Sequence, residues 1–150
     1  MEYIIKDLMN KTTLIVFLCL LLPLSLFNAQ DGKDEDTRKV KAIIIKAERG
    51  IVLSQISDLT DNLSSKTYLS LLNGVSGYYG NNQSYYILKN FLNDFKPVNC
   101  AFDNVQVKEN TAFASGNIKY LHNGIRGYSI VFITLQKQNE KWVITQITIN

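Results

Sequence analysis

Few residues in this chain could carry out covalent or acid–base chemistry, and they are widely spaced. The single histidine, His122, has no second histidine or cysteine at the spacing of a zinc site. Cys100 is the other candidate, because a thiolate beside an imidazole can act as a nucleophile. If the turn at residues 109–110 has two residues, Cys100 lies opposite Lys119 in a hairpin. His122 is three residues further on and points to the other face, so we expect an exposed histidine and a buried, unreactive cysteine.

Acidic residues offer no clearer sign of catalysis. A carboxyl group that is buried among apolar side chains has a raised pKa and can serve as a general acid or base. The acidic residues of the folded part lie instead beside predicted turns or polar neighbours: Asp58, Asp61, Asp94, Asp103, Glu109 and Glu140. The sequence therefore favours a protein that binds without transforming. The alternative is a small isomerase- or hydrolase-like enzyme that uses a pocket carboxylate or histidine.

Charge and sequence motifs narrow the classes of ligand. The chain has 16 basic and 13 acidic residues, and both signs mix within the segment DGKDEDTRKVK instead of clustering by sign. It contains no phosphate-binding P-loop, no dinucleotide-binding glycine pattern and no array of basic and aromatic residues. We therefore expect no cofactor, no metal site and no nucleic-acid partner.

Aromatic side chains are the better candidates for binding. Four tyrosines fall between residues 78 and 86. A tyrosine combines an apolar ring with a polar hydroxyl, which suits pocket mouths and interfaces. The competing interpretation is that these tyrosines have no binding role: they would belong to the start of a half-buried helix or follow the ordinary preference of tyrosine for strands. We take as candidate ligand-binding residues Tyr78, Tyr79, Tyr128 and Phe132.

The N-terminal segment reads as an export signal. Lys6 and Lys11 precede an uncharged, strongly apolar run over residues 12–30, a pattern typical of a secretory signal peptide. We predict a signal peptide over residues 1–29, cleaved near Ala29, and a periplasmic or secreted bacterial protein. The alternative is an uncleaved membrane anchor, because the run is nearly long enough to span a bilayer. Cleavage would remove Cys19 and leave Cys100 without a disulfide partner.

The remaining sequence predicts a linker over residues 30–39 and one domain over residues 40–150. The stretch from Tyr128 to Gln136 is apolar at both strand parities, so we expect it inside a sheet that is covered on both faces. Helical patterns cover 34–50 and 81–95, with a short helix or turn over 51–59, a loop over 60–66 and a connection over 74–80. Strands are expected at 67–72, 98–108, 111–122, 128–136 and 141–149. Helices packed on a largely antiparallel sheet define an α+β domain.

The hairpin signal Asn-Gly at 123–124 also sets a register. It aligns the small residues of one strand with the branched residues of the next: Ala112, Ala114 and Gly116 against Leu135, Ile133 and Val131. Small side chains there either leave room for a ligand or allow a helix to pack closely. Because protein interiors are densely filled, we favour close packing.

Three stretches carry a resemblance to known families: YYGNNQSYYILKNFL, ASGNIKYLHNG and the C-terminal WVITQITI. They resemble the secreted bacterial domain-of-unknown-function family numbered 4783, within the nuclear transport factor 2-like superfamily. The resemblance covers the chain from Lys41 onward and implies a cystatin-like cone in which a curved sheet wraps around helices. It implies no activity and no catalytic residue.

A binding role for such a cone leaves two places for a partner. A small apolar ligand would lie inside the cone, whereas a protein partner or a second copy of the chain would cover the outer sheet face. The two-sided apolarity of Tyr128 to Gln136 favours a homodimer, because a monomer would expose an apolar patch.

Overall fold

The computed structural model describes residues 24–150, so most of the predicted signal peptide lies outside the described residues, and its cleavage stays a prediction. Helix α2 (Leu24–Val52) includes Ala29 and the whole segment that was predicted to be a linker over residues 30–39. Opposite charges four residues apart, such as Asp34 and Arg38, favour a helix over an extended linker. Among the described helices, none is long and apolar enough to cross a membrane.

The chain divides into two units, Met1–Glu35 and Asp36–Asn150. The second unit is the folded domain, and its helices are the rest of α2 together with α3 (Ile56–Thr60) and α4 (Asn81–Phe95). The α4 helix begins as its sequence predicts, because the Gly80 N–H donates to the Gln83 side-chain oxygen at 3.2 Å. Pro97 follows the helix and prevents its continuation.

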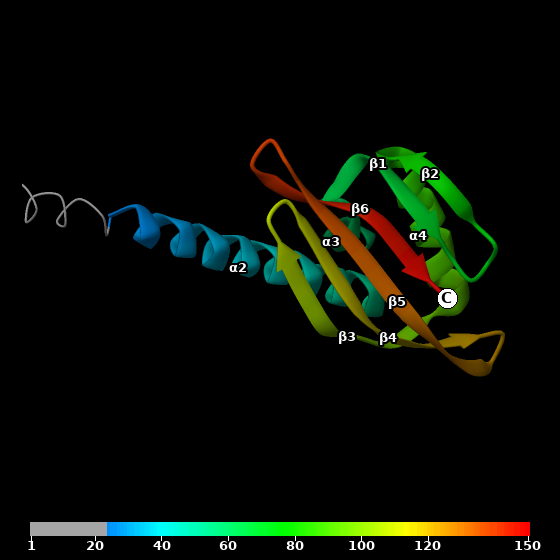
Figure 1. Cartoon of the computed structure of the whole chain (residues 1–150). Coiled ribbons are helices and arrows are strands. Elements are labelled where there is room, and N and C mark those ends of the chain that lie inside the picture. The colour runs from blue at the N-terminus through cyan, green and yellow to red at the C-terminus, as the bar shows by residue number, and fades with distance from the viewer. Residues whose placement is uncertain (1–23) are drawn as a thin grey trace, which may run out of the picture. The chain divides into compact units, whose positions relative to one another are not determined.

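Six strands form one sheet in the order β2-β1-β6-β5-β4-β3 (Figure 1). Their bounds are β1 (Leu63–Ser70), β2 (Ser76–Gly80), β3 (Pro97–Lys108), β4 (Thr111–His122), β5 (Ile125–Gln138) and β6 (Lys141–Ile149). All neighbours are antiparallel except β1 and β6, which run parallel. The predicted α+β class with a largely antiparallel sheet is confirmed.

Two segments that were predicted to be irregular are strands. The expected loop over 60–66 contains the start of β1, and the expected connection over 74–80 contains β2. Polar and glycine-rich sequences carry a weak strand signal, and β2 is a five-residue edge strand whose backbone pairs on one side only. Pairing with β1, not local propensity, gives this segment its structure.

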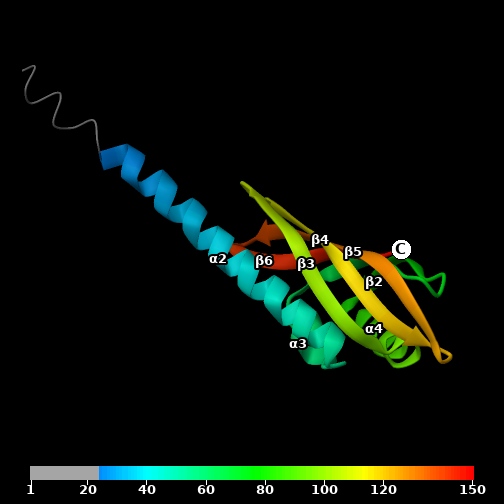
Figure 2. The same cartoon turned by 90° about the horizontal axis from the view of Figure 1, so that it is seen from below.

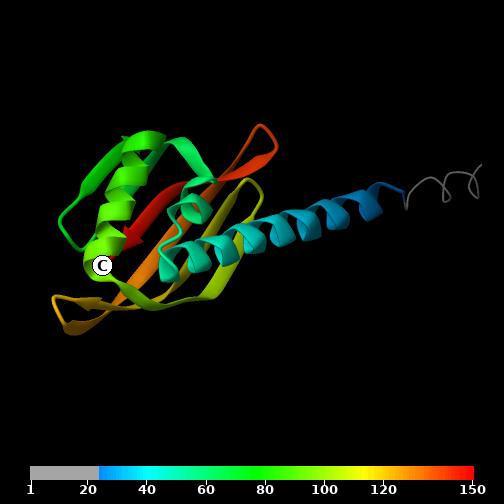
Figure 3. The same ribbon diagram turned by 180° about the vertical axis from the view of Figure 1, so that it is seen from behind.

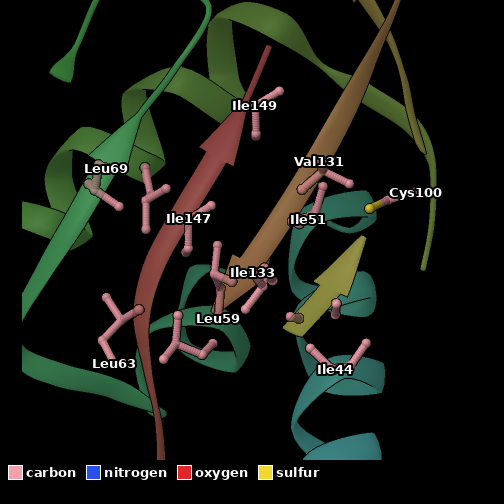
Figure 4. Close-up of a cluster of buried hydrophobic side chains, with 14 of the residues drawn as sticks. Ile44, Ile51, Leu59, Leu63, Leu69, Cys100, Val131, Ile133, Ile147 and Ile149 are labelled. Carbon is pink, nitrogen blue, oxygen red and sulfur yellow. The ribbon is translucent and has the colours of Figure 1, made fainter. Parts of the chain in front are cut away.

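The helices of the folded domain lie on one face of the sheet (Figures 2 and 3). Aliphatic side chains fill the space between the two layers (Figure 4). Val40, Ile44 and Ala47 from α2 are buried there, as are Val131 and Ile133 from β5. We call the sheet face that is turned toward the helices the inner face and the opposite one the outer face.

The register of β4 on β5 is the one that the Asn-Gly turn predicts. Asn123 and Gly124 both have positive φ, of 51° and 80°, as a two-residue hairpin turn requires. Ala112 therefore pairs with Leu135, and the predicted alignment of the small residues with the branched ones is confirmed.

The register of β3 on β4 differs from the prediction. Cys100 pairs with Ile118 instead of Lys119, because a bulge between Phe102 and Asn104 shifts the pairing by one residue. The backbone of β3 passes so close to Gly116 that a Cβ there would lie 1.9 Å from the Ala101 carbonyl oxygen. At this position the absent side chain makes room for a neighbouring strand, whereas a helix was the expected neighbour.

Candidate binding surface

The groups that were considered for catalysis are held in structural contacts. His122 lies at the end of β4, where its ring stacks on Phe95 with centroids 4.3 Å apart. Its Nδ1 lies 3.2 Å from the Asp94 carbonyl oxygen, and its Nε2 lies 3.1 Å from the Asn123 side-chain nitrogen. The imidazole therefore ties the β4–β5 hairpin to the end of α4.

Cys100 is buried on the inner face, as expected. Burial, with a smaller contribution from the Glu48 charge, raises the pKa of its thiol to about 12. A thiol with this pKa stays protonated near neutral pH and is a poor nucleophile. The Cys100 side chain therefore acts as a small apolar group in the core.

Acidic residues of the described part lie at the surface or are held in ion pairs and hydrogen bonds, such as the one that the half-buried Glu48 accepts from the Phe102 N–H at 2.7 Å. Asp58 accepts from Arg49 at 2.6 Å, and Asp103 accepts from the Asn117 amide at 3.0 Å. Among the residues that the structure describes, no carboxylate and no histidine is buried. Within the same residues, no three acidic, histidine or cysteine side chains gather as a metal site would require.

The outer face carries the exposed aromatic residues of the sheet. Cross-strand pairing arranges its side chains in rows that cross all six strands. The first row contains Tyr78, Tyr68, Gln146, Thr134, Phe113 and Gln106. The second row contains Ser76, Ser70, Thr148, Phe132, Ser115 and Asn104. We call these two rows the outer band.

Strand alternation divides the four residues that the sequence selected. Tyr78, Tyr128 and Phe132 lie on the outer face and are exposed by 66%, 60% and 42%. Tyr79 pairs with the buried Thr67 and packs against the core from the inner face. The four side chains therefore do not line one pocket, and the structure groups three of them on one surface.

Two aromatic residues of the outer band were not selected from the sequence. Tyr68 packs edge-to-face on Tyr78, with ring centroids 5.1 Å apart. Phe113 is 47% exposed, between the buried Ala112 and Ala114. The alternation of a large residue with two small ones in TAFASG is the sequence signal that could have placed Phe113 on the outer face.

A shallow hollow of about 440 Å³ lies on the outer band between β3 and β6. Phe113 and Phe132 line it together with Asn104, Gln106 and Gln146. Its volume falls within the range of about 300–1,000 Å³ that is common for small-ligand sites. Most of the lining residues are phenylalanines or carry amides and hydroxyls, and none is charged. The amides and hydroxyls offer hydrogen bonds without net charge.

Hydrogen bonds order the face beside this hollow. The Tyr128 hydroxyl donates to the Asn117 side-chain oxygen, and the Asn117 amide in turn donates to Asp103. The Gln146 amide donates to the Thr148 hydroxyl at 3.1 Å. Side chains that are held in place in this way lose little conformational entropy when they contact a partner.

A curved sheet wrapped around helices is the architecture of nuclear transport factor 2-like proteins with a cystatin-like fold. One such protein, from Novosphingobium aromaticivorans, superposes with a TM-score of 0.62 at 13% identity and covers 86% of this chain and 90% of its own. The comparison confirms the predicted fold class.

The chain belongs to the family described as Domain of unknown function (DUF4783), whose model matches residues 44–150. A member from Bacteroides uniformis has a TM-score of 0.62 and 18% identity, over 69% of this chain and 92% of its own. A member from Bacteroides ovatus has a TM-score of 0.60 and 16% identity, over 69% and 89%. No curated protein matches the chain. At these identities the solved structures establish the fold alone.

Proposed function

We propose that this chain is an exported, non-catalytic binding module that holds its partner on the outer face of the sheet. The observation that carries the proposal is the exposure of neighbouring apolar side chains on β4 and β5 of that face: Tyr128, Ile130, Phe132 and Phe113. Soluble proteins rarely expose contiguous apolar patches unless they bind something there.

The packing of the inner face supports the same conclusion. A small apolar ligand inside the cone was one of the two alternatives that the sequence left open, but aliphatic side chains from both layers meet across this space (Figure 4). The outer band, by contrast, presents rings and polar groups that are exposed or half-buried, apart from Thr148, and no helix of the folded domain lies on that face (Figures 2 and 3). The outer face is therefore the better candidate for the binding surface.

The homodimer that the sequence favours stays a prediction and would use this same face. Native mass spectrometry of the purified full chain reports self-association and bound adducts in one spectrum. We compare Ile130→Asp, on the outer face, with Ile125→Asp at the tip of the β4–β5 hairpin. Both isoleucines belong to β5, and Ile125 is 73% exposed, so the second variant controls for the added charge.

The proposal expects a dimer or an adduct that Ile130→Asp removes and Ile125→Asp retains. A charge buried at an interface without a counter-charge is costly, so the outer-face variant should release its partner. A bare monomer for the unmodified chain would overturn the homodimer. A complex that survives Ile130→Asp would place the binding surface elsewhere.

A further inference from the structure

The outer band has a composition that neither a solvated surface nor an apolar interface explains. Every residue in its two rows is aromatic, a hydroxyl or an amide, and none is charged, although 19% of the chain is charged. The band also contains no leucine, isoleucine, valine or methionine. Four of its twelve residues are aromatic and eight are polar, whereas the surface of homodimer interfaces is about 65% non-polar.

Rings and hydrogen-bonding groups are separated along the band. Tyr78 and Tyr68 lie at the β2 end, Phe113 and Phe132 lie on β4 and β5, and the Gln146 and Thr148 side chains from β6 lie between the two groups. Neighbouring strands are about 4.8 Å apart, which is close to the length of one sugar unit in an extended polysaccharide. A chain that crosses the strands would thus meet rings and polar groups at successive units.

We propose that the outer band binds a neutral polysaccharide, an inference that rests on the proposed function of the outer face. The C–H faces of sugar rings are apolar and pack on aromatic rings, whereas sugar hydroxyls both donate and accept hydrogen bonds. Amide and hydroxyl side chains such as Gln146 and Ser115 match them, because these groups also do both. The hollow beside Phe113 and Phe132 gives one unit of the chain room to lie below its neighbours.

The absence of charge in the outer band distinguishes this ligand from polyanions. Nucleic acids and acidic polysaccharides are held mainly by lysine and arginine contacts that release counterions. Lys66 on β1 and Lys108 on β3 lie one row beyond the band, and Lys119, which pairs with Tyr128, lies two rows beyond it on β4. The band therefore fits an uncharged chain of hydroxyl groups.

Affinity electrophoresis of the purified full chain tests this inference. Native gels contain soluble β-glucan, mannan, xylan or starch, and polygalacturonate serves as the acidic comparison. Tyr78→Ala and Phe113→Ala each remove a ring from one of the two aromatic groups of the band. The matched control is Tyr86→Ala on α4, because Tyr86 is 63% exposed and Tyr78 66%. Circular dichroism checks that each variant is folded, and sedimentation gives its oligomeric state.

We expect at least one neutral polysaccharide to retard the chain, with affinity reduced roughly tenfold by each outer-band substitution and unchanged by Tyr86→Ala. Retardation by polygalacturonate alone would overturn the inference. If no neutral polysaccharide retards the chain and the outer-band variants convert a dimer to a monomer, a second copy is the partner. In that case the proposed function stands and the polysaccharide does not. Absence of both effects overturns both proposals.

Discussion

The hydrogen bond between Asp36 of α2 and Trp142 of β6 leads to a specific prediction about stability. Trp142, the only tryptophan of the chain, is 4% exposed, and its indole N–H donates to Asp36 Oδ1 at 2.9 Å. The other carboxylate oxygen of Asp36 accepts from Lys137 at 3.1 Å. Asp36→Ala leaves the buried indole N–H without an acceptor, which costs about 1–3 kcal/mol. We therefore expect the free energy of unfolding to fall by about 2 kcal/mol.

A double-mutant cycle isolates the indole contribution. Trp142→Phe removes the donor, so in that background Asp36→Ala should cost about 1 kcal/mol less than in the unmodified chain. Urea unfolding followed by far-ultraviolet circular dichroism measures all four proteins without relying on tryptophan fluorescence. Equal costs of Asp36→Ala in the two backgrounds would refute the assignment of the loss to this hydrogen bond.

The same contact predicts an acid-dependent loss of stability. The hydrogen bond from Trp142, and after it Lys137, hold the pKa of Asp36 below its ordinary value against the opposing effect of burial. A carboxyl group with a lowered folded-state pKa stabilises the fold above its unfolded pKa and loses this contribution as the pH falls through the folded value. Asp36→Asn cannot titrate. The Asp36→Asn variant should therefore have a lower free energy of unfolding than the unmodified chain at pH 7, and this difference should shrink below about pH 4. A deficit that does not change between pH 7 and pH 3 would contradict this.

Two further predictions concern the β3–β4 pair. Gly116→Ala should lower the free energy of unfolding by about 3 kcal/mol or more, because the new Cβ meets the β3 backbone. Gly74→Ala, in a turn with open space around it, should lower the free energy of unfolding by less. Equal losses in urea unfolding would argue against the close approach of β3 to Gly116. Because burial raises the pKa of Cys100 to about 12, its peptide should stay unlabelled by iodoacetamide at pH 8 and become labelled in urea. Mass spectrometry of the digested protein resolves this site, and rapid labelling without urea would show that the thiol is accessible.

The parts of the fold that the sequence predicts correctly have strong local signals. Residues 81–95 combine a helical apolar stripe with a glycine cap and a following proline, and the structure places α4 over this range. Asn123-Gly124 specifies a two-residue turn, which fixes the β4–β5 register for the length of both strands. In these segments local propensity and tertiary pairing favour the same structure.

The errors fall where tertiary contacts decide. The β3 bulge follows from the approach of the Ala101–Phe102 backbone to Gly116, a contact between residues about fifteen positions apart. Strand β2 exists because β1 offers it an edge. Helix α2 continues through the charged segment that reads as a solvated linker, since a polar sequence does not distinguish a solvated helix from a solvated coil.

At the candidate site, too, the residue types could be chosen from the sequence, but their positions on the sheet could not. Clustering in the sequence selected Tyr78 and Tyr79 together, but successive residues of a strand point to opposite faces, so β2 separates them. Cross-strand pairing instead unites Tyr78 with Phe113, residues that no sequence window joins. If the outer band binds as one surface, the effects of Tyr78→Ala and Phe113→Ala on affinity should depend on ligand length. The binding of a polysaccharide that is long enough to cross the five strands from β2 to β4 should be weakened by either substitution. The binding of a disaccharide in the hollow should be weakened by Phe113→Ala alone.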